Sequence, residues 1–122
     1  MFNFFKKTKK PENLSQVLKK LENLEKEINT ISNGLEELKK EAKFFIQKVG
    51  VVRYNPFSEV GSNQSFSVAL LDSNNNGVVI TSLYTREGNR VYGKPVKNGE
   101  SDYSLSAEEK KAIEKAQLLD RS

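Results

Sequence analysis

The sequence predicts an α+β protein with a long N-terminal coiled-coil helix, a four-stranded antiparallel β-meander and a short C-terminal helix. Three observations predict this fold class. Apolar residues repeat every seven positions early in the chain, the period changes to two after Gly50, and a helix-capping motif begins at Ser106. We expect a basic tail at 1–11, a coiled-coil helix at 12–48 and a small β-domain at 49–122.

The predicted long helix has an apolar seam at heptad positions a and d. A stripe this narrow suits helix–helix contact, so we expect a homo-oligomer; the alternative is a long amphipathic helix that packs on its own sheet. Lys20 at position g and Glu25 at the following e would attract each other in a parallel pair. The seam residues are Leu14, Val17, Leu21, Leu24, Ile28, Ile31, Leu35, Leu38, Ala42 and Phe45.

A possible break in this helix lies at Gly34. Glycine costs about 1 kcal/mol relative to alanine inside a helix, and Asn33-Gly34 is a common turn sequence. A helical hairpin is therefore the rival structure. The heptad phase nevertheless passes unbroken from Ile28 to Leu35, and we expect one continuous helix.

Four strands are predicted at 49–54, 65–72, 78–85 and 90–96, separated by turn sequences rich in Asn and Gly. In the second strand Phe66, Val68 and Leu70 alternate with smaller residues, the pattern of a strand buried on one face. Pro95 cannot donate a ladder hydrogen bond, which predicts that the last strand lies at an edge. A capping box, with Ser106 followed three residues later by Glu109, then predicts a short helix.

The composition argues against an enzyme. The chain has no cysteine and no histidine, which removes thiolate chemistry, the imidazole base and the usual ligands of zinc, copper and iron. We predict no catalytic residue, no metal and no cofactor. A hydrolase built on Asp72 with Ser82 or Arg86 has no supporting spacing. Residues 72–77 match the start of a calcium loop, but position twelve is Leu83 rather than Glu, which favours a hairpin turn.

The net charge of +4 belongs entirely to the tail, because acidic and basic residues balance in every later segment. The tail is far too short to span a membrane. We expect it either to bind an anionic membrane surface or to form a solvated start of the chain. We expect a cytoplasmic protein, and the membrane interpretation makes it peripheral at the inner face of the membrane. The residues in question are Phe2, Phe4, Phe5, Lys6, Lys7, Lys9 and Lys10.

Basic and aromatic residues alternate along the strands and predict a partner-binding face. An unidentified protein is the expected partner. The molecule would then be an adaptor or scaffold in which a coiled coil brings several copies of the β-domain together. The alternative is a single-stranded nucleic-acid binder that uses the same face. We do not expect nucleic acid, because the folded body has no net positive charge. The predicted face contains Arg53, Tyr54, Tyr84, Arg86 and Tyr92.

The strand region resembles a family of small bacterial proteins known as domain of unknown function 4446. The resemblance is carried by IQKVGVVRYNPF at 46–57, QSFSVALLD at 64–72, NGVV at 76–79, SLYTR at 82–86, and Lys-Pro and Asn-Gly at 94–95 and 98–99. It covers about residues 44 to 116. Family members carry a membrane-spanning helix, a coiled coil and then this domain. The resemblance therefore implies the same architecture, no established activity and an N-terminus facing a membrane. This chain departs from the pattern, because the Phe/Lys tail stands where the span is expected.

Overall fold

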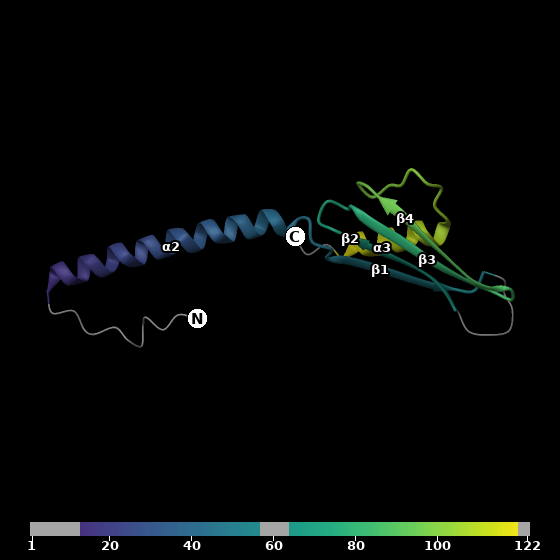
Figure 1. Cartoon of the computed structure of the whole chain (residues 1–122), viewed down its shortest axis with the longest axis horizontal. Coiled ribbons are helices and arrows are strands. Elements are labelled where there is room, and N and C mark those ends of the chain that lie inside the picture. The colour runs from purple at the N-terminus through teal and green to yellow at the C-terminus, as the bar shows by residue number, and fades with distance from the viewer. Residues whose placement is uncertain (1–12, 57–63, 120–122) are drawn as a thin grey trace. The chain divides into compact units, whose positions relative to one another are not determined.

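The computed structural model describes residues 13–56 and 64–119. The chain divides into two compact units, Met1–Lys39 and Lys40–Ser122. The described part of the first unit is helical, and the second unit is a small β-domain with a helix packed on it (Figure 1).

Helix α2 spans Leu14–Ala42 without a break. Its 29 residues correspond to a length of about 43 Å. The side-chain Oδ1 of Asn13 accepts a hydrogen bond of 2.9 Å from the backbone N–H of Gln16, which is the usual N-cap geometry. The helix passes through Gly34 with regular geometry, so the prediction of one continuous helix is confirmed.

The ends of α2 differ from the predicted bounds of 12–48. The backbone N–H groups of Phe44 and Phe45 donate to carbonyls only three residues earlier, which tightens the chain into a turn. The Gln47 side chain then donates to the Ala42 carbonyl at 2.9 Å and satisfies one free acceptor at the helix end. Phe45 therefore lies beyond α2, although the heptad spacing predicted it at a helical d position.

The second unit contains a four-stranded antiparallel sheet in the order β1-β2-β3-β4 (Figure 1). This order confirms the predicted meander, and it places Pro95 on an edge strand as expected. Each strand pairs with the next along the chain, and short turns connect β2 to β3 and β3 to β4. The strands are β1 Lys48–Tyr54, β2 Ser65–Leu71, β3 Gly77–Thr85 and β4 Gly88–Val96.

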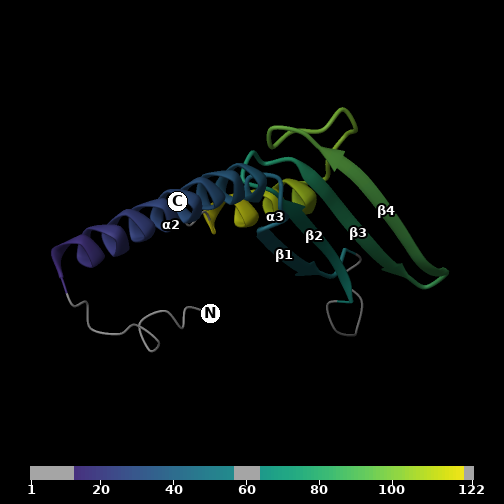
Figure 2. The same cartoon turned by 60° about the vertical axis from the view of Figure 1, so that its left-hand side comes forward.

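Helix α3, Ala107–Leu118, lies against one face of the sheet and packs mainly on β1 and β2 (Figure 2). The predicted capping box is present. The Ser106 hydroxyl accepts from the Glu109 N–H at 3.1 Å, and the Glu109 carboxylate accepts from the Ser106 N–H at 2.8 Å. The core between helix and sheet contains Val52, Ala69, Leu71, Val79, Val96, Ala112, Ile113 and Ala116.

The face of β2 that α3 buries is the one with small side chains. Ser65, Ser67 and Ala69 are 0–1% exposed, whereas Phe66, Val68 and Leu70 point to the opposite face and are only half-buried. The alternating pattern is therefore confirmed, but its larger apolar residues lie outside the core beneath α3.

The close approach of α3 to the sheet explains why the face with small side chains is the buried one. A Cβ added to Gly50 would overlap the Ala112 carbonyl oxygen and lie 2.5 Å from the Ala116 nitrogen. The helix thus presents alanines to a strip of the sheet built from glycine, serine and alanine. Side chains of phenylalanine size on that strip would hold the helix away from the sheet.

Candidate functional site

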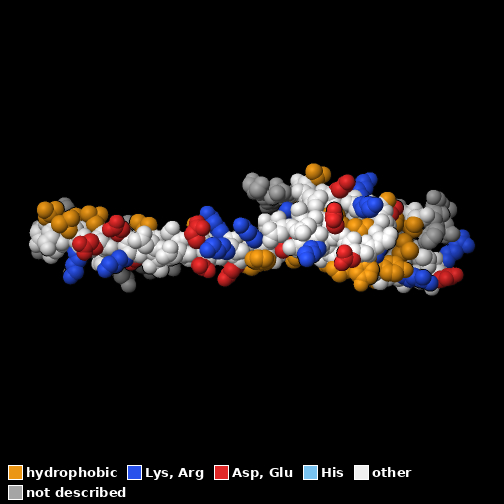
Figure 3. Space-filling view, turned by 90° about the horizontal axis from the view of Figure 1, so that it is seen from above, with side chains coloured by type: hydrophobic (Ala, Val, Ile, Leu, Met, Phe, Trp, Pro, Cys, Tyr) orange, Lys and Arg blue, Asp and Glu red, His pale blue; other side chains and the backbone are white. Residues whose placement is uncertain are grey.

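The seam of α2 is the first apolar surface that the described chain leaves uncovered. No residue of α2 is buried. Leu14 is 72% exposed and Ile28 62%, and the other large seam residues beyond Val17 and Leu24 are about half exposed. Figure 3 shows hydrophobic side chains along this helix. A monomeric helix with such a stripe places apolar surface in water at every turn.

The second uncovered surface is the face of the sheet opposite α3. Because directly paired residues of antiparallel strands share a face, the register defines its members. Hydrophobic side chains gather on this part of the domain in Figure 3. The surface, here named the open face, consists of Val49, Val51 and Arg53 of β1, Phe66, Val68 and Leu70 of β2, Val78, Ile80, Ser82 and Tyr84 of β3, and Asn89, Val91, Gly93 and Pro95 of β4.

Burial differs sharply between the two faces of the sheet. Ala69, Leu71 and Val79 on the α3 side are fully buried, whereas Val51 and Val91 on the open face are 46% and 67% exposed. No described element of the β-domain covers the open face. Sheets of soluble proteins usually bury an apolar face against a helix or a second sheet, so this surface is a candidate for an interface.

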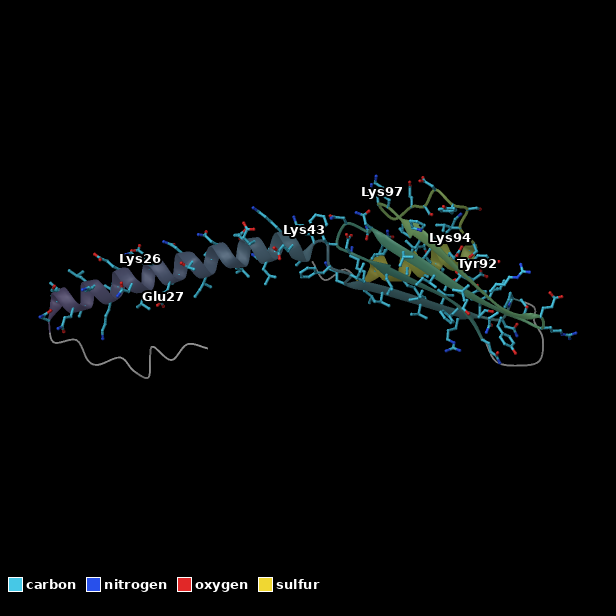
Figure 4. All side chains as sticks on the ribbon, in the orientation of Figure 1. Lys26, Glu27, Lys43, Tyr92, Lys94 and Lys97 are labelled. Atoms are coloured by element: carbon cyan, nitrogen blue, oxygen red, sulfur yellow. The ribbon has the colours of Figure 1, made fainter. Side chains whose placement is uncertain are left out.

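The five residues predicted to form one partner-binding face are divided between the two faces. Arg53 and Tyr84 lie on the open face. Tyr54 packs against the core, and Tyr92 pairs with Thr81 and so lies on the side of α3. Figure 4 shows Tyr92 on β4 next to the labelled Lys94, which shares its face.

Arg86, the fifth residue of the predicted face, lies in the turn between β3 and β4. The prediction of a single face with all five side chains is therefore wrong. Neighbouring residues of a strand, such as Arg53 and Tyr54, point to opposite sides because the side-chain period is two.

A buried polar cluster lies between α3 and the sheet. The Glu109 carboxylate, 2% exposed, accepts hydrogen bonds from the Thr81 hydroxyl at 2.7 Å and the Lys94 ammonium at 2.8 Å, in addition to the Ser106 N–H. The Ser67 hydroxyl lies 2.7 Å from that of Thr81 and extends the network into β2.

The electrostatics of this cluster favour an ionised Glu109. Burial raises the pKa of its carboxyl, but hydrogen bonds from Lys94, Ser106 and Thr81, together with the Lys94 charge, outweigh burial and lower the pKa below its ordinary value of 4.5. Among the described residues, every buried side-chain nitrogen and oxygen has a hydrogen-bond partner. A carboxylate that accepts three hydrogen bonds from its own chain holds α3 on the sheet.

The segment that resembles the start of a calcium loop forms the turn between β2 and β3. The Asp72 carboxylate accepts from the backbone N–H groups of Asn74 and Asn76, at 2.8 and 3.0 Å. The ammonium of the buried Lys48 donates to the Asn75 side chain at 2.9 Å. Within the described ranges, no cluster of acidic side chains has the arrangement of a metal site. These contacts are those of a hairpin turn that is also held by Lys48 of β1 and by the backbone of Asn98.

One family model, described as protein of unknown function (DUF4446), matches residues 1–117. The chain belongs to this family. The match is longer than the predicted resemblance at 44–116, because it includes the seam helix and the tail. No curated protein and no solved structure matches the chain.

The open face is the feature of this DUF4446 member that sequence reasoning missed. Its signal was present in the sequence: Ala112 and Ala116 give α3 a small-residue stripe that permits close approach to small residues on the sheet. That match would have assigned the small side of β2 to the core and the large apolar side to the opposite face.

The predicted membrane-surface residues, Phe2 to Lys10, lie outside the described residues. Over the residues that the structure does describe, no helix is both long and apolar enough to cross a membrane.

Proposed function

We propose that this DUF4446 protein is a non-enzymatic oligomeric adaptor, in which α2 joins several copies and the β-domain offers a surface for protein binding. The observation that carries the proposal is the exposed seam of α2. A helix of 29 residues that buries none of them in its own chain has little tertiary support, and isolated helices are marginal in water. Association through the seam supplies the missing burial.

The non-enzymatic part of the proposal has two supports. The sequence lacks histidine and cysteine. In addition, the buried carboxylate of Glu109 is engaged by three hydrogen bonds from its own chain and is 2% exposed. Binding through apolar surfaces therefore accounts for the conspicuous features of the molecule better than catalysis does.

The test of self-association uses two polar substitutions in the seam. Ile28→Asn with Leu35→Asn places two amides at consecutive a positions, and Lys19→Asn with Lys26→Asn makes matched changes at outward-facing f positions. Light scattering coupled to gel filtration should give an oligomer for the wild type and the control, and a monomer for the seam variant. A wild-type monomer at 100 μM would contradict the proposal.

The proposal includes weak attachment of the tail to the cytoplasmic face of the membrane. Each lysine near an anionic surface contributes about 1 kcal/mol, and an oligomer would present several tails at once. The full chain should co-sediment with anionic vesicles, whereas a chain that starts at Pro11 should not. Equal sedimentation of the two proteins would remove the membrane from the proposal.

The alternative of single-stranded nucleic-acid binding is less well supported. A stacking platform needs aromatic and basic side chains on one surface, but the sheet register separates Arg53 and Tyr84 from Tyr54 and Tyr92. Fluorescence anisotropy with a labelled oligonucleotide at two salt concentrations tests this alternative. Tight, salt-sensitive binding would favour it over the adaptor.

A further inference from the structure

We infer that the open face packs on the open face of a second copy, and that the oligomer is therefore parallel. The inference rests on the proposed association through α2 and names what the β-domains do once the helices have joined. Three properties of the open face support it: its composition, its size and its position in the chain.

The composition of the open face suits a copy of itself. Ten of its fourteen side chains are aliphatic, aromatic or proline, and Arg53 carries its only charge. Two such faces can pack together without burying an acidic group and without bringing two strongly charged surfaces of the same sign together. Inner faces of β-sandwiches have the same character, with two apolar sheets packed about 10 Å apart.

The size of the open face favours a tethered partner over a free one. Four strands about 4.8 Å apart and a length of about 20 Å give roughly 400 Å² for each copy. Two faces would bury about 800 Å², which is below the 1,200–2,000 Å² typical of stable complexes between separate proteins. A second copy held nearby by a coiled coil has a high effective concentration, so it can occupy a face of this size.

The position of the open face determines the direction of the helices. Only five residues separate the end of α2 from the start of β1, and five extended residues reach at most about 17 Å. In a parallel pair both β-domains follow the same end of the coiled coil, whereas antiparallel helices separate them by about the 43 Å length of α2. The attraction between Lys20 and Glu25 also favours the parallel arrangement.

The absence of cysteine from the full chain allows a direct test by cross-linking. Single cysteines are introduced at Leu14 in the seam, at Ile80 in the centre of the open face, and at Lys111 on the exposed side of α3 as the control. Each protein is treated with a bismaleimide whose span is about 8 Å. We expect Leu14→Cys and Ile80→Cys to give cross-linked dimers, and Lys111→Cys to give at least tenfold less.

The outcomes separate this inference from the proposed function. Cross-linking at Leu14→Cys with no excess at Ile80→Cys over Lys111→Cys would overturn the pairing of the open faces and leave self-association intact. An oligomer that fails to cross-link at Leu14→Cys is antiparallel, which also overturns the inference. A monomer with no cross-link at any position would overturn both.

A second pair of variants measures the contribution of the open face without relying on a cysteine at its centre. Val51→Glu with Val91→Glu places carboxylates at two exposed positions of the open face, so the fold should tolerate them. Lys97→Glu with Lys111→Glu is the control. The first pair should weaken dimerisation at least tenfold by sedimentation equilibrium, and an unchanged dissociation constant would contradict the inference.

Discussion

At the scale of single residues, Glu109 joins three parts of the β-domain. It caps its own helix through Ser106, it accepts from Thr81 on β3, and it forms an ion pair with Lys94 on β4 at 2.8 Å. Helix α3 packs mainly on β1 and β2, so this carboxylate is its main polar link to the other half of the sheet.

Substituting Glu109→Gln should destabilise the β-domain by about 2 kcal/mol, because hydrogen bonds to a buried charged group contribute more than neutral ones. Urea unfolding followed by tyrosine fluorescence measures the change. The control is Glu108→Gln, one residue earlier on α3, which should stay within about 0.5 kcal/mol of the wild type. Equal stability of the two variants would show that the network contributes nothing.

The same carboxylate predicts how stability depends on pH. Because the pKa of Glu109 is lower in the folded protein than its ordinary value of 4.5, its contribution is complete above pH 4.5 and is lost as the pH falls through the folded pKa. The stability difference between wild type and Glu109→Gln should therefore shrink between pH 5 and pH 3. Urea midpoints measured across this range provide the check, and a constant difference would contradict the assignment.

Gly50 is the residue at which the packing of α3 on the sheet is tightest. Gly50→Ala should cost about 2–3 kcal/mol, since the added methyl group overlaps the backbone of α3 and the helix must shift. Gly93 on β4 is the matched control, because a Cβ there meets nothing within 4 Å. Thermal unfolding should show a large loss of stability for Gly50→Ala and almost none for Gly93→Ala. Similar losses of stability in the two variants would mean that glycines in the strands affect stability through chain entropy alone.

At the scale of elements, the long helix contains one clear local defect. Gly34 lies inside α2 with ordinary helical geometry and open space around its missing side chain. Gly34→Ala should therefore increase helicity and strengthen association, by about 1 kcal/mol for each chain. Circular dichroism at several concentrations measures both effects. A fall in helicity would instead indicate that residues near Asn33 turn, as in a hairpin.

The order and type of the elements could be predicted from the sequence, because each has a strong local signal. The heptads predicted α2, the Asn- and Gly-rich turns predicted the meander, and Ser106 with Glu109 predicted the start of α3. The end of α2 was missed, since the heptad spacing continues to Phe45 while the Gln47 side chain and two short-range backbone bonds close the helix at Ala42. Such capping contacts depend on the chain after the helix.

Which face of the sheet lies beneath α3 was harder to predict. An alternating strand defines two faces but does not say which one is covered. The larger side chains of β2, such as Phe66, form one of these faces, and the close approach at Gly50 made the opposite, small face the buried one. A separate error grouped Arg53, Tyr54 and Tyr92 on a single face, although strand register alone assigns them to opposite sides.

At the scale of the whole molecule, the two compact units depend on different sources of stability. The β-domain has its own core and a satisfied polar network, whereas α2 buries nothing within the chain. Association should therefore affect the stability of α2 much more than the stability of the β-domain. Spectroscopy can separate the units, because all four tyrosines belong to the β-domain and α2 contributes 29 helical residues against 12 in α3.

The last prediction uses this separation in the seam variant Ile28→Asn with Leu35→Asn. Its far-ultraviolet helical signal should fall by more than half, since α2 loses the partner that stabilises it. Its near-ultraviolet tyrosine signal should remain, because the hydrogen bonds of Glu109 and the core around Leu71 lie within one chain. The f-position control should keep both signals. Loss of the tyrosine signal with the helix would mean that the β-domain folds only in the oligomer, which would make the open face part of its core.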